Sequence, residues 1–344
     1  MLKRWKKPWI NENQFNNLLK RVSLILENSK VIVISYQNTG ANWLGVKNAT
    51  INMFPNQHLI IPQTYSNSLL SREQREEFAE FLKENGAQLI IFSGIPEYAI
   101  NWIQYIHSID IQIGVIYHGG VAELNGNTLR QKQIGNILNL ANTNVINRIG
   151  VVKEGLKEWF EKSTNAKTFR VIPITHIPKN IKIEKYNDEK VHIGVFGNSS
   201  YNKNRHTQVI AASMIENSVV HIIAPNEFDY VLESNRIKIH ENCDRKSFLK
   251  LLGSMDVNIY CSYSESWGQI VLESIALETP CLFSYNSGLH NFLGDQFLIK
   301  NCDNIQEIHS KLKSVLEKKT SLKENHEKLN LFGQDLNRKF IELD

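Results

Sequence analysis

The chain has 344 residues, a length that corresponds to about two domains of ordinary size. Hydrophobic residues make up 42% of it and charged residues 22%, which is typical of globular proteins and excludes a disordered chain, a collagen-like chain and a coiled-coil rod. The net charge of +4, from 39 basic and 35 acidic residues, is too small for a protein that binds a nucleic-acid backbone.

The first segment, Leu2–Trp9, combines four basic residues with two tryptophans. This composition suits peripheral contact with the inner face of an anionic membrane, and the alternative is a terminus that packs on its own domain. No apolar stretch approaches the ~18 residues of a membrane span. The cysteines, at positions 243, 261, 281 and 302, lack the spacing of a disulfide framework or a metal site. We therefore expect a cytoplasmic protein.

Short apolar runs alternate with amphipathic stretches along the chain. The runs are rich in Ile and Val at consecutive positions, which is typical of strands buried on both faces of a parallel sheet. They are Val31–Ser35, Gln88–Phe92, Gln112–Ile116, Arg170–Ile174, Val191–Phe196, Val219–Ile223, Asp256–Tyr260 and Cys281–Ser284. The helices predicted between them include Arg72–Asn85 before Gly86, Thr128–Ala141, and Lys246–Ser254 after the N-cap Asp244. The alternation predicts an α/β protein with βαβ crossovers.

A polar segment divides the chain into two parts. Ile177–Lys190 contains a proline and shows no strong periodicity, so we interpret it as a linker. The linker separates two doubly wound domains, at 1–178 and 190–328. The last residues, 329–344, are predicted to be helical and could cross back onto the first domain.

The segment Ser262–Gly288 has the densest set of chemically useful residues. A predicted strand leads into a polar loop and then a helix, so the loop lies where open α/β sheets bind ligands. Gly268 lets a bound group approach the backbone, and the first helical N–H groups, at Gln269 and Ile270, suit a pyrophosphate. Glu265 in the loop and Glu273 in the helix could accept hydrogen bonds from sugar and ribose hydroxyls.

As a bare pair, two glutamates eight residues apart would be solvated surface carboxylates. The whole string, however, resembles the E-x7-E motif of retaining GT4-type glycosyltransferases with the GT-B fold, roughly S-x-x-E-G-F-G-x-x-x-x-E-A-x-A-x-G-x-P. The matching positions are Ser262, Glu265, Trp267, Gly268, Glu273, Ala276 and Pro280. Ser266 and Glu278 stand where the family has glycine. The resemblance implies two Rossmann-like domains that face each other across a cleft.

The residues after the strand at Val191–Phe196 agree with the resemblance. Family members have Gly-Arg there and a lysine six residues after the glycine, and the two cations hold the donor diphosphate. Gly197 and Lys203 match, whereas Asn198 stands in place of the arginine, so the second positive charge is missing or comes from Arg205. The alternative for Lys203 is a surface lysine in a polar loop.

The first domain offers fewer candidates. His118 ends a predicted strand before two glycines, and the resemblance places such a histidine near the transferred sugar, although a structural histidine is the alternative. Thr39 and Gly40 occupy the place of the family's glycine-rich loop on the acceptor side.

The resemblance implies a hexosyl-type glycosyltransferase that moves a sugar, with retention, from a nucleotide-diphosphate donor to a hydroxyl of a saccharide or lipid-linked acceptor. Glu265, His118 and Lys203 would act at the transferred group, and Glu273 would hold the ribose. The resemblance implies no further cofactor and no metal, and no D-x-D motif ends a predicted strand. Asn- and Ile-rich composition suggests an AT-rich bacterial or viral genome, and hence surface-polysaccharide or glycoconjugate assembly.

Other classes fit the sequence less well. The chain has no G-x-x-x-x-G-K-[ST], no G-x-G-x-x-G after its first strand and no G-x-S-x-G, which argues against a P-loop hydrolase, an ordinary dehydrogenase and an α/β-hydrolase. Two alternatives keep the fold. One is a non-catalytic GT-B scaffold that partners a glycosyltransferase, and the other is a nucleotide-sugar epimerase.

Overall fold

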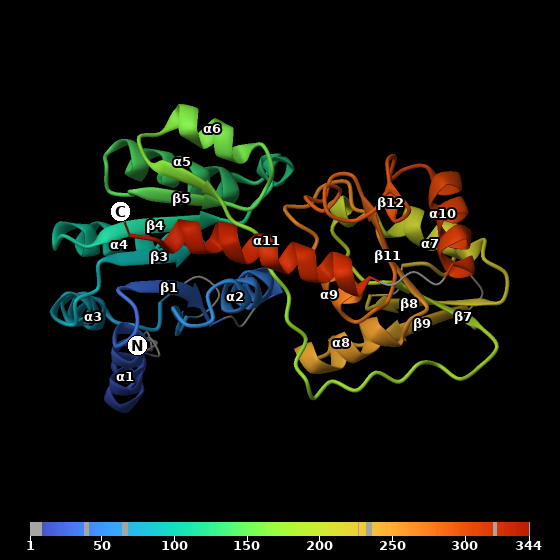
Figure 1. The fold of residues 1–344 in the computed structure, drawn as a ribbon, viewed down its shortest axis with the longest axis horizontal. Coiled ribbons are helices and arrows are strands. Elements are labelled where there is room, and N and C mark those ends of the chain that lie inside the picture. Colours follow the sequence, from blue (N-terminus) through green and yellow to red (C-terminus); the bar gives the residue numbers. More distant parts are fainter. Residues whose placement is uncertain are drawn as a thin grey trace, which may run out of the picture. The chain divides into compact units, whose positions relative to one another are not determined.

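The computed structural model describes residues 9–37, 41–63, 68–225, 227–231, 236–318 and 322–343. Thr39, Gly40 and all of Leu2–Trp9 except the last residue lie outside this part of the chain. Two compact units are present, Met1–Pro173 with Gly333–Asp344, and Ile174–Phe332. Each unit contains a six-stranded parallel sheet (Figure 1).

The sheet of the first unit has the strand order β2-β1-β3-β4-β5-β6. Its strands are β1 (Val31–Tyr36), β2 (His58–Ile61), β3 (Leu89–Ser93), β4 (Gln112–Tyr117), β5 (Arg148–Val151) and β6 (Lys167–Arg170). The helices are α1 (Glu12–Leu26), α2 (Ala41–Met53), α3 (Arg72–Glu84), α4 (Ala99–Ser108), α5 (Thr128–Asn142) and α6 (Leu156–Ser163), with a 3-10 turn, η1 (Val121–Leu124). Every residue of β1 and β3 is buried, which confirms the prediction of strands covered on both faces.

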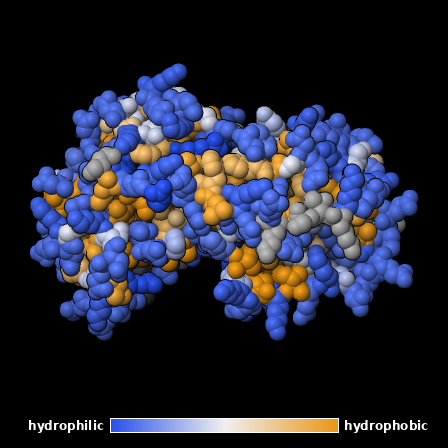
Figure 2. Space-filling view, viewed as in Figure 1, coloured by the Kyte–Doolittle hydropathy of each residue, from blue (hydrophilic) through white to orange (hydrophobic). Residues whose placement is uncertain are grey.

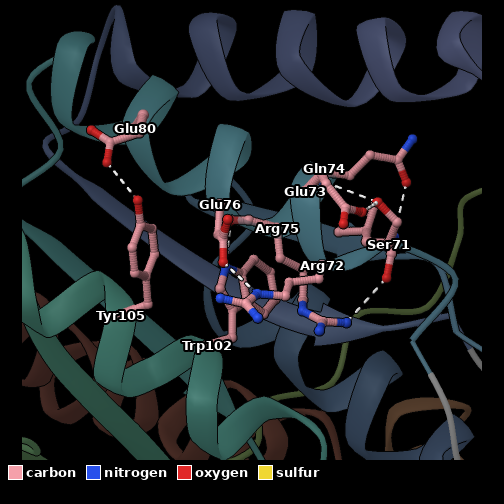
Figure 3. A network of polar contacts seen from close by, with 10 residues as sticks. Ser71, Arg72, Glu73, Gln74, Arg75, Glu76, Glu80, Trp102 and Tyr105 are labelled. Atoms are coloured by element: carbon pink, nitrogen blue, oxygen red, sulfur yellow. Dashed lines mark hydrogen bonds and ion pairs between the residues drawn. The ribbon is translucent and has the colours of Figure 1, made fainter.

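Local sequence signals set the ends of α3. Ser71 Oγ accepts a hydrogen bond from the Gln74 N–H at 3.1 Å, and the Gln74 side chain accepts one from the Ser71 N–H at 3.0 Å (Figure 3). This reciprocal capping box starts the helix. Gly86 follows the helix end with φ +76°, a left-handed conformation that glycine adopts without strain, so the predicted end is confirmed. Trp102 of α4 donates from Nε1 to the Arg75 carbonyl at 3.0 Å and ties the two helices together.

The last helix is α11 (Lys323–Ile341), and its residues from Gly333 onward belong to the first unit and complete its core. Phe340 is fully buried, and a Cβ built on Gly150 would lie only 3.0 Å from its ring. The guanidinium of Arg148, itself buried in β5, donates to the carbonyls of Phe340 at 2.9 Å and Glu342 at 2.7 Å. These bonds satisfy carbonyls that a helix end otherwise leaves without partners.

The predicted strand Arg170–Ile174 is wrong beyond its first residue, because β6 ends at Arg170. The side-chain amide of Asn337 accepts from the Ile172 N–H at 2.9 Å and donates to its carbonyl at 2.8 Å. Asn330 binds the backbone of Thr175 in the same two-point way, at 3.1 and 2.9 Å. Amides of α11 therefore take the place of a neighbouring strand, and an apolar, buried run lies outside the sheet.

The sheet of the second unit has the order β12-β11-β10-β7-β8-β9. Its strands are β7 (Val191–Val195), β8 (Ser218–Ile223), β9 (Ile237–His240), β10 (Val257–Tyr260), β11 (Cys281–Ser284) and β12 (Leu298–Ile299). The helices are α7 (Arg205–Ser213), α8 (Arg245–Ser254), α9 (Gln269–Ala276) and α10 (Ile305–Glu317), with a 3-10 turn, η2 (Tyr201–Lys203). Asp244 accepts from the Ser247 N–H at 2.9 Å, so the predicted N-cap of α8 is confirmed.

Exposed apolar side chains occur singly or in small groups. Figure 2 shows hydrophobic side chains at the surface over α11, where Leu331 is 66% and Phe332 46% exposed. Exposure of this extent is ordinary for a globular surface. Among the described helices, none combines the length and the hydropathy needed to cross a bilayer.

Candidate functional site

The loops that follow β7 and β10 form the chemically densest region of the second unit. The two strands are parallel neighbours, so their carboxyl ends lie side by side. The Tyr263 N–H donates to the Asn202 carbonyl at 2.8 Å, and Asn202 Nδ2 donates to the Ser264 carbonyl at 3.3 Å. The structure therefore brings together the two segments that the sequence singled out separately.

Lys203 and Glu265 form an ion pair across these loops. The pair is largely buried, with 17% of the lysine side chain and 10% of the glutamate side chain exposed. Tyr260, at the end of β10, donates from its hydroxyl to Glu265 Oε1 at 2.7 Å. Burial, and then the nearby Glu265 charge, raise the pKa of Tyr260 well above its usual value, so the phenol keeps its proton and acts as a donor.

Glu273 lies in α9 and is only 1% exposed. It is ion-paired with Arg245, the first residue of α8. Of the described residues, Arg245 is the one that bonds the Glu273 carboxylate. A buried carboxylate requires such a partner, because an isolated charge in the interior is very costly.

The N-terminus of α9 offers free backbone donors. Gly268 precedes the helix with φ +92°, and no side chain caps its first turn. The Val271 N–H bonds to the Gly268 carbonyl at 3.0 Å, whereas the N–H groups of Gln269 and Ile270 have no acceptor among the described residues. The Gln269 side chain is held separately, since its Nε2 donates to Thr175 Oγ1 at 2.9 Å. Two N–H groups at the positive end of a helix form a ready anion site.

Several predicted donor-binding residues have other surroundings. Trp267 is 2% exposed, and a Cβ on Gly288 would lie 2.5 Å from its ring, so the indole packs beneath the loop. Ser262 is fully buried, and within the described part of the chain its hydroxyl finds no partner. Asn198 is exposed, and its side chain accepts from the Ser200 N–H at 3.1 Å in a local turn. Gly197 lies against Lys203, whose Cβ would be 3.4 Å from a Cβ on the glycine.

Arg205 points away from Lys203. Its guanidinium donates to the carbonyls of Ile223 at 2.9 Å and Pro225 at 3.2 Å, and lies 5.1 Å from the Phe228 ring centroid. Ile223 ends β8 and the other two residues follow it, whereas Lys203 contacts the end of β10, and β7 lies between the two strands. The two cations are therefore placed on opposite sides of β7.

The first unit holds His118, just after β4. Its Nε2 lies 2.8 Å from Ser93 Oγ at the end of β3, and Ser93 Oγ lies 2.6 Å from Thr50 Oγ1 in α2. Burial, and to a smaller extent the charge of Arg130, lower the pKa of His118 to about 4. The imidazole is therefore neutral near pH 7 and lines a small cavity together with Arg130 and Gln133.

Sequence reasoning missed the partners of the candidate residues. Tyr260 ends a predicted strand and Arg245 follows a predicted N-cap, so the sequence placed both residues at the ends of secondary-structure elements. No local pattern indicates that they pair with Glu265 and Glu273. Ser93 carried a weaker signal, as the polar end of a buried strand. Thr50 carried none. In the described part of the chain, no group of three or more His, Cys, Asp or Glu residues is placed to hold a metal ion.

Comparison with known families identifies the second unit. Residues 177–331 match the family model described as glycosyl transferases group 1. This range contains Lys203, Glu265 and Glu273, together with the whole second sheet. The protein is a transferase enzyme with a group 1 glycosyltransferase domain. No curated protein matches the sequence of the enzyme.

Solved structures resemble the enzyme over most of its length. The sucrose-phosphate synthase of Thermosynechococcus elongatus is 14% identical, with a TM-score of 0.63 over 90% of this chain and 98% of that one. HepE of Anabaena in complex with UDP is 12% identical, with the same TM-score and coverage. WaaG, a glycosyltransferase involved in lipopolysaccharide biosynthesis, is 13% identical, with a TM-score of 0.57 over 90% and 98%. The likeness confirms the predicted GT-B fold of two doubly wound α/β domains.

Proposed function

We propose that the enzyme is a retaining glycosyltransferase of the GT4 type, which moves a sugar from a nucleotide-diphosphate donor to a hydroxyl of a saccharide or lipid-linked acceptor. The observation that carries the proposal is the uncapped N-terminus of α9, whose Gln269 and Ile270 N–H groups lack acceptors among the described residues. Glu265, in the loop just before this helix, is ion-paired with Lys203. Free N–H groups and a nearby cation suit the doubly charged diphosphate of a nucleotide sugar.

The buried Glu273 carboxylate would hold the ribose of the donor. Its partner Arg245 is 33% exposed and holds the carboxylate in a fixed direction. A carboxylate can accept two hydrogen bonds from a vicinal diol, and the ribose of a nucleotide offers such a diol. Glu265, fixed by Tyr260 and Lys203, would orient the hydroxyls of the transferred sugar.

The reaction exchanges one bond at the anomeric carbon for another on the same face. The bond from the anomeric carbon to the diphosphate oxygen breaks, and a bond to the acceptor oxygen forms. The acceptor's hydroxyl proton passes to the departing diphosphate oxygen. Lys203 and the N–H groups of Gln269 and Ile270 would stabilise the charge that grows on that diphosphate, without a metal ion. His118 would lie near the hydroxyls of the transferred sugar.

The pathway proposal follows from the neighbours. WaaG acts in lipopolysaccharide biosynthesis, HepE was solved with UDP, and TarM of S. aureus with UDP and alpha-GlcNAc-glycerol. These relatives support surface-polysaccharide or glycoconjugate assembly as the setting of the enzyme and make UDP the first nucleotide to test.

The donor site is tested by titrating the enzyme with UDP, GDP, ADP and CMP and following thermal stability. A bound nucleotide at a hundredfold excess over Kd stabilises the folded state by about 2.7 kcal/mol. We expect Glu273→Gln and Lys203→Met to abolish this stabilisation, whereas Lys246→Met, an exposed cation in the first turn of α8, keeps it. A response to no nucleotide, or an unchanged response in both site variants, would reject the donor site.

The reaction is tested by incubating the enzyme with the nucleotide sugar of the base selected above and a panel of saccharide acceptors. We expect a product with the donor's anomeric configuration by NMR, formed equally well with EDTA present. A product of opposite configuration refutes retention. Conversion of the sugar without an acceptor indicates an epimerase instead.

A further inference from the structure

A hydrogen-bond chain runs through the buried interior of the first unit and ends at His118. It begins at the Val46 carbonyl in α2, which lies 2.7 Å from Thr50 Oγ1. It continues from Thr50 Oγ1 to Ser93 Oγ at 2.6 Å and from Ser93 Oγ to His118 Nε2 at 2.8 Å. Thr50 and Ser93 are fully buried, so these hydroxyls have each other as partners rather than solvent.

The carbonyl at the start of the chain fixes the direction of every bond. A carbonyl oxygen only accepts, so the Thr50 hydroxyl donates its single proton to the Val46 carbonyl. Thr50 Oγ1 can then only accept from Ser93, whose hydroxyl proton is used in that bond. Ser93 Oγ has a lone pair left for His118, so Nε2 of the imidazole must carry the proton. If Ser93 donated to Nε2 instead, Thr50 Oγ1 and Ser93 Oγ would lie 2.6 Å apart with no proton between them.

We propose that Thr50 and Ser93 are positioning residues that lock His118 as the Nε2–H tautomer, so that Nδ1 meets the substrate as an obligate hydrogen-bond acceptor. The ligand that suits such a nitrogen is a hydroxyl group, which donates to it. This proposal rests on the proposed function and deepens it, because it states which ring nitrogen receives a sugar hydroxyl and in which protonation state.

The surroundings of the imidazole support an accepting role. The low pKa of His118, about 4, keeps the ring neutral, since burial and the Arg130 charge oppose a second proton. Arg130 is ion-paired with Glu123 at 3.7 Å and donates to Gln133 Oε1 at 3.3 Å. Arg130, Gln133 and His118 line one cavity, so a neutral acceptor lies beside a cation there.

The tautomer can be read directly by long-range ¹H–¹⁵N NMR of histidine side chains in the full-length enzyme, with the His118→Gln spectrum used to assign the signal. We expect the wild type to carry its proton on Nε2. Thr50→Val removes the acceptor for the Ser93 hydroxyl, which then turns to donate to Nε2, so the proton should move to Nδ1. Thr50→Ser keeps the hydroxyl and should keep the wild-type tautomer.

Activity gives the second readout. We expect Thr50→Val to lower kcat/KM for transfer at least tenfold while leaving UDP binding unchanged, and Thr50→Ser to restore most of that loss. Thr143→Val is the matched control, because Thr143 also donates to the carbonyl four residues earlier, at 2.9 Å, but is exposed at the end of α5.

The outcomes separate this proposal from the proposed function. A proton on Nδ1 in the wild type, or a Thr50→Val enzyme with the wild-type tautomer, overturns the positioning role even if transfer is observed. The wild-type spectrum decides this without any variant, so a misfolded Thr50→Val protein does not leave the matter open. Absence of glycosyl transfer together with an Nε2 proton overturns the proposed function and leaves the tautomer lock standing.

Discussion

Arg245 and Glu273 form an ion pair between the first residue of α8 and the buried side of α9. The pair joins two helices at the carboxyl edge of the second sheet and neutralises a carboxylate that is 1% exposed. Arg245 therefore fixes the position of the Glu273 carboxylate, which we propose binds the ribose.

Arg245→Ala should destabilise the second unit, because it removes the cation that is paired with the buried Glu273 carboxylate. Breaking a buried pair costs about 3–5 kcal/mol, and the 33% exposure of the arginine reduces this to about 1–3 kcal/mol. Urea unfolding with and without Glu273→Gln checks the cause, since the neutral amide should remove most of the penalty. As a control, Arg72→Ala breaks the exposed Arg72–Glu76 pair and should leave the unfolding midpoint where it is. Equal midpoints for Arg245→Ala and wild type would contradict the prediction.

Asn337→Ala should destabilise the first unit, since it leaves the N–H and the carbonyl of Ile172 buried without their side-chain partner. Each unsatisfied buried group costs about 1–3 kcal/mol. Asn337→Asp can still accept from the N–H but cannot donate to the carbonyl, so it should lie between alanine and wild type. Lys339→Ala, an exposed change in the same helix, provides the control in chemical unfolding. A similar stability of all four proteins would show that the amide is dispensable.

A row of histidines should make the enzyme lose stability in mild acid. His192 Nε2 lies 2.7 Å from Asp188, His192 Nδ1 lies 2.8 Å from His221 Nε2, and His221 Nδ1 lies 2.9 Å from His240 Nε2. Burial, and then the charges of neighbouring histidines, lower the pKa of His221 to about 3. Between about pH 6.5 and pH 3, His221 is therefore protonated in the unfolded chain, where the histidine pKa is about 6.5, but not in the folded state.

The free energy of unfolding should consequently fall as the pH drops from about 6.5 towards 3, by up to about 1.4 kcal/mol per pH unit for His221. Denaturant titrations at pH 7.5, 6.0 and 5.0 measure the slope. His221→Gln should make the slope less steep, although His118, with its pKa of about 4, still contributes, whereas His206→Gln, with half of the side chain exposed, should leave the slope as it is. A slope that His221→Gln leaves unchanged would place the acid sensitivity elsewhere.

Removal of residues 1–8 should weaken binding to anionic membranes. The removed residues include Lys3, Arg4, Lys6 and Lys7, and each basic residue near a charged surface contributes about 1 kcal/mol. Co-sedimentation with vesicles containing 30% phosphatidylglycerol measures the loss, and vesicles of phosphatidylcholine alone serve as the control. Undiminished binding of the shortened enzyme would assign membrane contact to another surface, and binding by neither form would dismiss it.

Local patterns were enough to predict much of the secondary structure of the second unit. The buried runs of β7, β10 and β11, the N-cap Asp244 and the loop before α9 follow from composition and spacing alone. The short strands β2, β5, β9 and β12 were missed, because β12 has only two residues and each of the other three contains His, Arg or Lys within its four residues, which shortens the apolar run.

Pairings between distant residues could not be predicted. Lys203 and Glu265 are 62 positions apart, and nothing local indicates that they form an ion pair. By its position in the sequence Arg205 is a candidate to bind the diphosphate, but its guanidinium donates to the carbonyls of Ile223, at the end of β8, and Pro225. Only the fold reveals which of several nearby polar groups a long side chain reaches.

The contribution of α11 to the first unit has a consequence for biosynthesis. Phe340 and Asn337, which complete the core of that unit, emerge from the ribosome only after residues 174–332 have been made. Domains generally fold in order of synthesis. Here the unit that is translated first remains unfinished while the second is produced, and its core can be completed only after the whole second unit has passed through the exit tunnel.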